Sequence, residues 1–165
     1  MVEPVQVLIT IGSNINREQN LPAALDLLGT WPGIRLVAVS PVYDTAPIGG
    51  RPDQPRFYNA AALVETALGP EALKQALRSI EAQLGRRRVA DKYAPRPIDL
   101  DIAMYGRQVL GLNGRHIPDP EIVRFPHLAL PLADIAPDWV HPELGVTLRD
   151  IARQMSFSEE EIQKL

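Results

Sequence analysis

The segment Arg96-Pro97-Ile98-Asp99-Leu100-Asp101-Ile102 alternates two carboxylates with aliphatic side chains. Alternation is the period of a β-strand, so we expect Asp99 and Asp101 to project from one face of a sheet and the aliphatic residues from the other. Neighbouring carboxylates repel each other, and a bound divalent cation removes this repulsion. Oxygen ligands without nearby Cys or His are typical of magnesium. The segment therefore predicts a metal-binding strand, with a solvated outer strand face as the alternative.

Positive charge is concentrated just before this strand. Five cations within eleven residues, against the single carboxylate of Asp91, are Arg86, Arg87, Arg88, Lys92 and Arg96. A run of charge is usually a solvated loop, and that interpretation stays open. In a chain with a net charge of −3, an anionic ligand explains the cluster better, because arginine suits phosphate oxygens. Cations beside carboxylate-held magnesium indicate a nucleotide triphosphate site.

The composition is that of a soluble globular protein, with 45% hydrophobic and 22% charged residues. The length predicts a single domain over residues 1–165. The net charge argues against broad nucleic-acid binding. The sequence has no cysteine, which excludes disulfides, thiolate zinc sites and Cys nucleophiles. Because no apolar run suits a signal peptide or a membrane span, we expect a cytoplasmic protein.

Strand and helix patterns alternate along the chain. The patterns typical of strands cover residues 5–11, 34–43 (interrupted near Pro41), 57–67 and 97–105. The clearest helical stripes cover residues 21–28, capped by Asn20, and 70–84. The order β-α-β-β-α-β predicts an α+β fold, the ferredoxin-like split βαβ, with helices packed on an antiparallel-rich sheet. A C-terminal helical extension is predicted at 128–135, at 148–155 and after a capping box at Ser158 and Glu161.

Asn59 stands in an otherwise apolar strand, so its amide is buried and needs hydrogen-bonding partners. A neighbouring loop could supply them, but an amide can also read a flat heterocycle through a paired donor and acceptor. Phe57 lies two residues earlier and on the same face, where it could stack on that ring or belong to the core. Residues 45–55, just before this strand, are rich in Pro and Gly, and loops of this length are usually functional or disordered.

Together these residues resemble the 6-hydroxymethyl-7,8-dihydropterin pyrophosphokinase family. Its signature of Arg, two residues and then Asp-aliphatic-Asp-aliphatic matches residues 96–102. The resemblance continues in order over nearly the whole chain, through residues 11–14, 43–49, 53–61, 80–86 and 130–137.

The resemblance implies an ATP-dependent pyrophosphokinase of folate biosynthesis. Such an enzyme transfers pyrophosphate from ATP to the hydroxymethyl group of the pterin and releases AMP. Two Mg²⁺ would be held by Asp99 and Asp101, with further catalytic roles for Arg86 and Arg96. The positions that match the family's pterin contacts are Thr45, Ala46, Ile48, Phe57, Asn59 and His127. Those that match its ATP contacts are Glu81, Arg86, Arg88, Lys92, Arg96 and Ile102.

The implied partners are the two small-molecule substrates, bound by a monomer that contacts neither nucleic acid nor membrane. The loops at residues 47–55 and 86–95 are expected to close over bound substrates.

Three positions depart from the family pattern. Asp119 stands where the family commonly has His. Phe125 aligns with the usual Arg of the family, and Arg124 lies one position before it. His127 replaces a stacking aromatic. These departures leave open a catalytically weakened member of the family. A non-catalytic ferredoxin-like module that binds RNA or a protein partner is a further alternative, although the aromatic content of 5% and the acidic strand disfavour it.

Overall fold

The computed structural model describes residues 3–48, 54–87, 89–90 and 94–165. β1 (Val5–Ser13) lies in the interior of its main sheet and pairs antiparallel with β4 (Phe57–Thr66) and β5 (Asp99–Tyr105). β2 (Ile34–Val39) and β3 (Tyr43–Thr45) both pair antiparallel with β4 on its other side. The order β5-β1-β4, followed by β2 and β3, is the ferredoxin-like arrangement, so the predicted fold class is confirmed.

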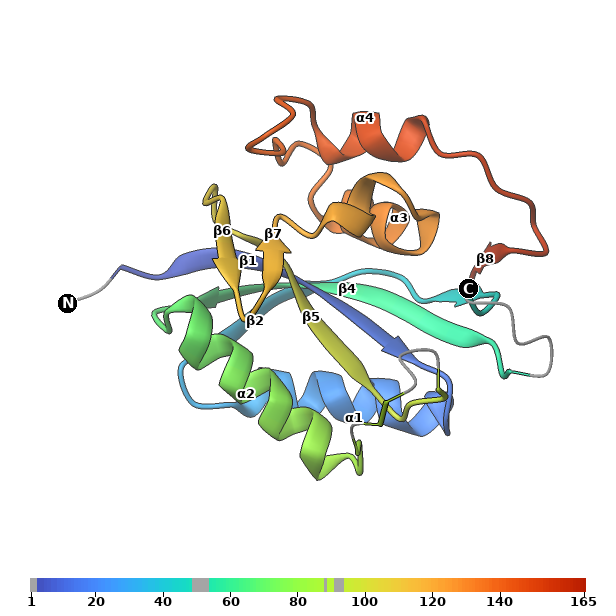
Figure 1. Ribbon diagram of the computed structural model, residues 1–165, viewed down its shortest axis with the longest axis horizontal. Coiled ribbons are helices and arrows are strands. Elements are labelled where there is room, and N and C mark those ends of the chain that lie inside the picture. Colours follow the sequence, from blue (N-terminus) through green and yellow to red (C-terminus); the bar gives the residue numbers. More distant parts are fainter. Residues whose placement is uncertain (1–2, 49–53, 88, 91–93) are drawn as a thin grey trace.

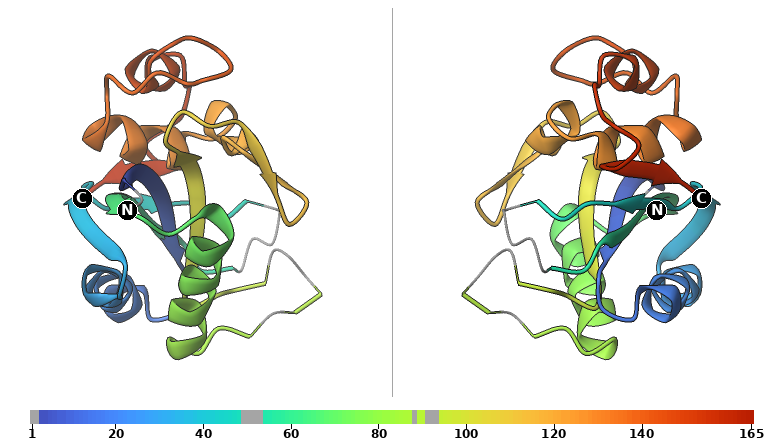
Figure 2. Two further views of the ribbon diagram at one scale, coloured as in Figure 1. Left: turned by 90° about the vertical axis from the view of Figure 1, so that its left-hand side faces the viewer. Right: turned by 90° about the vertical axis from the view of Figure 1, so that its right-hand side faces the viewer.

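Helices cover both faces of the sheet (Figure 1; Figure 2). α1 (Arg17–Thr30) and α2 (Pro70–Gln83) pack on one face over a core that includes Ile9, Leu77 and Leu100. α3 (Pro126–Ile135) and α4 (Leu148–Arg153) lie on the opposite face over a second core around Leu8, Met104 and Leu132. Among the described residues, no helix combines the length and apolarity needed to cross a bilayer.

A small hairpin follows β5. β6 (Leu110–Leu112) and β7 (Arg115–Ile117) pair with each other, and β7 contacts β5 beyond the edge of the main sheet. The chain then passes through a short 3-10 helix, η1 (Pro120–Val123), into α3. The hairpin and η1 therefore stand beside the acidic strand at its exposed edge.

α1 begins earlier than the sequence predicts. Asn16 adopts the left-handed conformation (φ 44°), and its carbonyl accepts a helical hydrogen bond from Asn20 N at 2.8 Å, so the helix starts at Arg17. The predicted cap, Asn20, instead lies inside the helix, where its side chain donates to the Ile15 carbonyl at 2.6 Å.

The prediction of a helix after Ser158 is wrong. The capping-box side chains do bond, because Ser158 Oγ donates to Glu161 Oε1 at 3.3 Å and accepts from Glu161 N at 3.2 Å. They close a turn that leads into β8 (Ile162–Lys164), which pairs antiparallel with β3. Ile162 is only 5% exposed, so burial against the sheet overrides the local signal. Ala46 N also donates to the Glu161 carbonyl at 2.8 Å, which ties the segment after β3 to the C-terminal strand.

The predicted alternation along β5 is confirmed. Ile98, Leu100 and Ile102 belong to the core on the α1 and α2 side, and each is no more than 6% exposed. Asp99 and Asp101 project from the other face, where the sheet is not covered by α3 and a cavity opens. The strand thus serves as a wall of the core on one side and as a ligand-facing surface on the other.

Candidate active site

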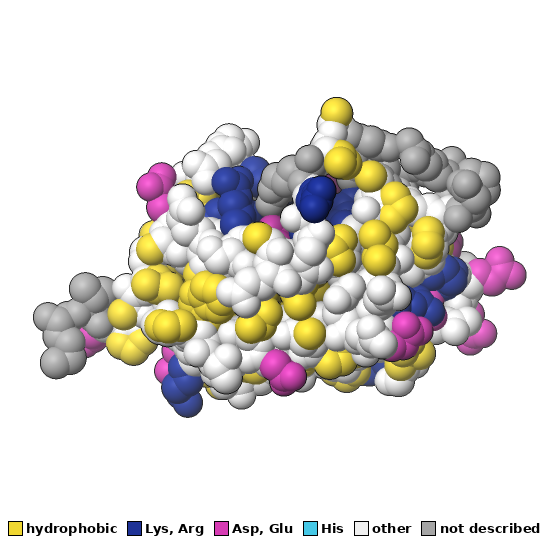
Figure 3. All heavy atoms as spheres, turned by 90° about the horizontal axis from the view of Figure 1, so that it is seen from below, with side chains coloured by type: hydrophobic (Ala, Val, Ile, Leu, Met, Phe, Trp, Pro, Cys, Tyr) yellow, Lys and Arg dark blue, Asp and Glu magenta, His cyan; other side chains and the backbone are white. Residues whose placement is uncertain are grey.

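A cavity of about 600 Å³ lies over the ends of β1, β4 and β5, beside α3. It brings together most of the site residues that the sequence predicts, namely Thr45, Ala46, Ile48, Phe57, Asn59, Arg86, Arg96, Asp99, Asp101 and His127. Figure 3 shows Lys and Arg side chains gathered around an acidic side chain at one margin of the molecule. The cavity therefore combines an anionic floor with cationic walls.

Asp99 is held by two arginines. Arg86 Nη1 donates to Asp99 Oδ1 at 2.8 Å, and Arg96 Nη1 donates to Asp99 Oδ2 at 3.1 Å. Burial alone would raise the pKa of Asp99, but the charges of Arg86 and Arg96 outweigh it and hold the pKa below its ordinary value. Asp99 is therefore ionised at neutral pH and ready to bind a cation.

Asp101 stands in a different electrostatic environment. Arg115 Nη1 donates to its Oδ1 at 3.0 Å, and Lys74 Nζ lies 3.6 Å from the same oxygen. Burial and the neighbouring Asp99 charge raise the pKa of Asp101, and these two cations compensate only in part. The two carboxylates therefore repel each other in the metal-free protein, as the sequence indicates.

Glu81 positions the arginine rather than facing the cavity. It is 3% exposed on α2, and its Oε2 accepts from Arg86 Nη1 at 2.7 Å and from Leu100 N at 2.9 Å. Arg86 Nη1 also reaches the Ile98 carbonyl at 3.1 Å. The carboxylate lies beneath Arg86 and is outside the cavity lining, and the assignment of Glu81 to the nucleotide side of the site stays a prediction.

Asn14 fixes Arg96, and sequence reasoning missed this role. Asn14 Oδ1 accepts from Arg96 N at 2.8 Å, and Asn14 N donates to the Arg96 carbonyl at 3.1 Å. Its Nδ2 donates to the Pro55 carbonyl at 3.2 Å. One side chain at the end of β1 therefore joins the segments that enter β4 and β5. The only local signal was an Asn that follows Gly-Ser at the end of a strand.

The other half of the cavity is formed by β1, β3 and β4. Asn59 Nδ2 donates to Thr45 Oγ1 at 2.5 Å, and the Asn59 side chain is largely buried. Gly12 lies opposite, and a Cβ on it would stand 3.0 Å from Asn59 Oδ1. Phe57 shares this face, as predicted, and the Arg96 guanidinium lies 5.8 Å from its ring centroid. An amide edge beside a ring is a suitable surface for a flat heterocycle.

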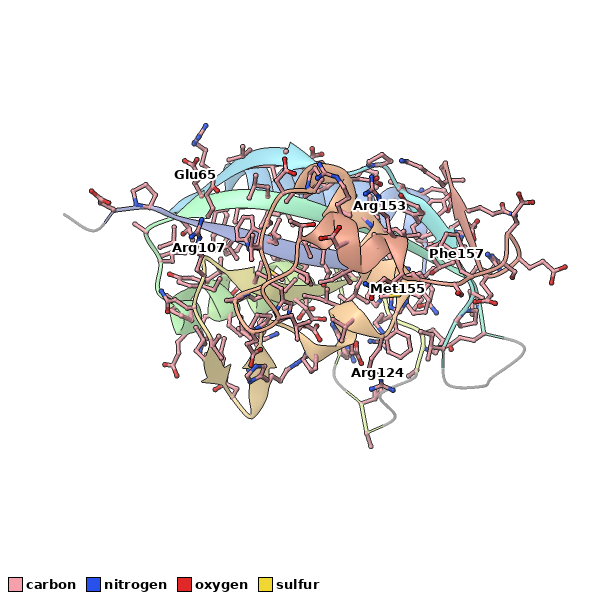
Figure 4. All side chains as sticks on the ribbon, turned by 90° about the horizontal axis from the view of Figure 1, so that it is seen from above. Glu65, Arg107, Arg124, Arg153, Met155 and Phe157 are labelled. Atoms are coloured by element: carbon pink, nitrogen blue, oxygen red, sulfur yellow. The ribbon has the colours of Figure 1, made fainter. Side chains whose placement is uncertain are left out.

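His127 and Phe125 form an aromatic wall at the start of α3. Their ring centroids are 5.4 Å apart and the rings are inclined by 28°. Burial lowers the pKa of His127 to about 4, so the imidazole is neutral at physiological pH. Arg124 lines the same cavity, and its guanidinium carbon lies 5.0 Å from the centroid of the Phe125 ring. In Figure 4, Arg124 is labelled at the edge of the molecule opposite Glu65. Arg124 therefore brings a cation to the wall where the family pattern places one at position 125.

His127→Phe should make protein stability less dependent on pH. Between pH 6.5 and 4 the unfolded chain binds a proton at His127 that the folded chain does not, so the free energy of unfolding falls as pH is lowered. Urea unfolding at pH 7.5 and pH 5 should show that the variant loses less stability than the wild type, by on the order of 1 kcal/mol. Equal losses in the two proteins would contradict the buried neutral imidazole.

Three ATP-contact assignments need separate comment. Ile102 packs into the core with α1 and α2, so its side chain points away from the cavity, and its contact with the nucleotide stays a prediction. Arg88 and Lys92 lie outside the described residues, as do parts of both loops expected to close over substrates.

The structure adds residues that sequence reasoning left unassigned: Arg115, Asp119 and Glu121 line the wall beyond Asp101. Burial raises the pKa of Asp119 and of Glu121.

Comparison with known proteins identifies the kind of site. A family model described as 7,8-dihydro-6-hydroxymethylpterin-pyrophosphokinase matches residues 8–137. The 2-amino-4-hydroxy-6-hydroxymethyldihydropteridine pyrophosphokinase of Pseudomonas aeruginosa is 42% identical over 140 residues, which cover 84% of this chain and 85% of that protein. A protein of the same name from Haemophilus influenzae is 32% identical, and the match covers 98% of both chains.

Longer proteins contain a similar unit. The folic acid synthesis protein fol1 of Pneumocystis carinii is 40% identical over 143 residues, which cover 86% of this chain and 19% of that protein. A solved Plasmodium falciparum HPPK-DHPS structure with pterin and p-hydroxybenzoate matches with a TM-score of 0.77 over 99% of this chain and 47% of that chain. At 15% identity this likeness concerns the fold alone. From the family model and the relatives of similar length, the chain belongs to the 7,8-dihydro-6-hydroxymethylpterin-pyrophosphokinase family.

Proposed function

We propose that this cavity carries out the reaction of the family, the transfer of pyrophosphate from ATP to the hydroxymethyl group of 6-hydroxymethyl-7,8-dihydropterin, with release of AMP. The observation that carries the proposal is the placement of Asp99 and Asp101 on one face of β5, inside a cavity that arginines line on one side and Asn59 on the other. A triphosphate and a flat heterocycle can therefore lie side by side over the sheet.

The residues present fit magnesium. Two carboxylates project in the same direction from positions 99 and 101, and Mg²⁺ is usually bound by one or two carboxylates together with substrate phosphates and water. Within the part of the chain that the structure describes, no group of three or more His, Asp or Glu side chains encloses a metal site. We infer that Asp99 and Asp101 hold two Mg²⁺ jointly with the triphosphate. When bound, these ions would neutralise charge that develops on the transferred phosphates.

The arginines act as fixed cations. Arg86 is held by Glu81 and the Ile98 carbonyl, and Arg96 is anchored through its backbone to Asn14. Groups that are already oriented stabilise a transition state without reorganising during the reaction. Arg86 and Arg96 would therefore exchange their bonds to Asp99 for phosphate oxygens when the nucleotide and its metal ions arrive.

The pterin would lie against β4 and α3. The Asn59 amide would pair with the donor and acceptor edge of the ring, while Phe57 and neutral His127 offer stacking surfaces. Thr45, Ala46 and Ile48 border the same space. This arrangement would aim the hydroxymethyl group towards Asp101, which is the nearest candidate to accept the hydroxyl proton.

The proposal is tested by a coupled assay for AMP with ATP and the hydroxymethyl pterin as substrates. We expect AMP to form only when both substrates and Mg²⁺ are present, with one AMP released per diphosphorylated pterin. Formation of ADP instead of AMP, or AMP release that does not require the pterin, would overturn the assignment. The same assay separates an active enzyme from the weakened family member that the Asp119 and Phe125 departures left open.

We also propose that the chain acts as a monomeric, single-domain protein of the cytoplasm whose partners are these small molecules. The two cores packed on opposite faces of one sheet support one domain, and the net charge of −3 disfavours nucleic acid. Sedimentation at micromolar concentration should give a mass near 18.2 kDa.

A further inference from the structure

We propose that Arg115 is a further cationic contact to the triphosphate, and that the buried carboxylate of Asp119 is its positioning residue. The proposal rests on the function proposed above and adds a residue that neither the signature nor the basic loop contains. It concerns the wall of the cavity beyond Asp101, which is formed by β7 and η1.

Arg115 reaches the cavity from outside the main sheet. It is the first residue of β7, and its guanidinium passes the exposed edge of β5 to place Nη1 3.0 Å from Asp101 Oδ1. Its side chain remains 55% exposed, so it can turn without disturbing the core. The basic loop supplies Arg86 and Arg96 from the Asp99 side, whereas Arg115 approaches Asp101 from the other. A phosphate chain held above both carboxylates would therefore meet cations at each end.

Asp119 caps η1 and also lies beside this arginine. Its side chain is 6% exposed, and Oδ2 lies 3.8 Å from Arg115 Nη2. Its backbone N donates to the Ala103 carbonyl at 2.9 Å, and its Oδ1 accepts from Glu121 N at 2.9 Å, so the carboxylate is fixed between β5 and η1. A buried carboxylate is costly without a cation, and the guanidinium of Arg115 is the cation that lies beside Asp119.

The two contacts of Arg115 have different consequences when metal and nucleotide bind. Asp101 would be engaged as a metal ligand, so its bond to Arg115 Nη1 would be replaced. The contact with Asp119 lies off the metal site and can persist, which keeps the guanidinium at the rim. Arginine has five N–H donors, so Nη1 and the remaining donors can turn to phosphate oxygens while Nη2 stays towards Asp119. Thus Asp119, an anion where the family commonly has His, acts by orienting a cation four residues before it.

The test measures nucleotide binding and turnover separately in the full-length chain. Calorimetry would use Mg²⁺ with a non-hydrolysable ATP analogue, and the AMP assay would give KM for ATP and for the pterin. Arg115→Gln should raise the Kd of the analogue and the KM for ATP by about 10- to 100-fold, with little change in pterin affinity. Arg115→Lys should recover only part of this loss, because an ammonium group cannot form a fork.

Asp119 is tested through its coupling to Arg115. Asp119→Asn should weaken analogue binding by about 3- to 10-fold in the wild-type background and have little effect in the Arg115→Gln background. Asp119→Glu, which keeps the charge, should bind the analogue better than Asp119→Asn. The matched control is Arg35→Gln, which removes an equal charge from the surface pair with Glu65 at 2.8 Å and should bind like the wild type.

Wild-type affinity in Arg115→Gln, or equal loss of analogue and pterin, would overturn the role of Arg115. If the losses of analogue affinity from Arg115→Gln and Asp119→Asn multiply in the double variant, the two residues act independently and the role of Asp119 is overturned. If the wild type releases no AMP with the pterin but Arg115→Gln still weakens analogue binding, the nucleotide contact stands and the proposed reaction fails.

Discussion

Asp99→Asn and Asp101→Asn should each lower the rate of pyrophosphoryl transfer by about a thousandfold or more, because each removes a carboxylate that would hold the metal ions against the triphosphate. The amide keeps the shape of the carboxylate, so the fold should remain. The AMP assay at saturating ATP and pterin measures the change in kcat. Near-normal turnover in either variant would contradict the metal assignment.

The same two variants should differ in stability, which provides an internal control. The arginines lower the pKa of Asp99, so its charge stabilises the folded state at neutral pH and Asp99→Asn should lower the free energy of unfolding. Burial and Asp99 raise the pKa of Asp101, so its charge is unfavourable without metal and Asp101→Asn should be neutral or stabilising. Asp26→Asn, on the exposed side of α1, should change neither activity nor stability appreciably.

Asn59→Ala should weaken pterin binding by about a hundredfold while binding of the magnesium nucleotide persists. The amide lies on the β3 side of the cavity, bonded to Thr45 Oγ1, whereas Arg86 and Arg96, which would hold phosphate, bond to Asp99 on β5. Calorimetry with each ligand alone measures the two affinities. An equal loss for pterin and nucleotide would show that Asn59 supports the whole site rather than reading the heterocycle.

Gly12→Ala provides a companion test without removing any hydrogen-bonding group. The new Cβ would stand 3.0 Å from Asn59 Oδ1 and 3.7 Å from Phe57, which is tight enough to shift the amide by a few tenths of an ångström. Pterin affinity should therefore fall in the same direction as in Asn59→Ala, by a smaller factor. Unchanged pterin affinity would mean that the amide orientation is not critical.

Local periodicity was sufficient to predict the acidic strand. The alternation at residues 98–102 gave both the strand and the face that its carboxylates occupy, because one face of β5 is covered by α1 and α2 and the other borders the cavity. The same rule placed Phe57 and Asn59 together on β4. These predictions held because side-chain direction in a strand depends only on position.

Contacts between distant segments could not be read from local patterns. Asn14 bonds to Arg96 across 82 positions, and β8 pairs with β3 in place of the helix that its capping box indicates. Arg115 and Asp119 flank a cis bond at Ile117-Pro118, and nothing in their spacing shows that they meet Asp101. Glu81 and Ile102 were matched by position alone, and their burial, which places both side chains outside the cavity lining, could not be read from that match.

The central claim is that Asp99 and Asp101 bind divalent metal together with a nucleotide. Electron paramagnetic resonance of Mn²⁺, titrated into the protein with a non-hydrolysable ATP analogue, measures this directly. We predict two bound Mn²⁺ per chain in the presence of the analogue, and loss of this binding in the Asp99→Asn, Asp101→Asn double variant. Retention of both ions by the double variant would contradict the claim.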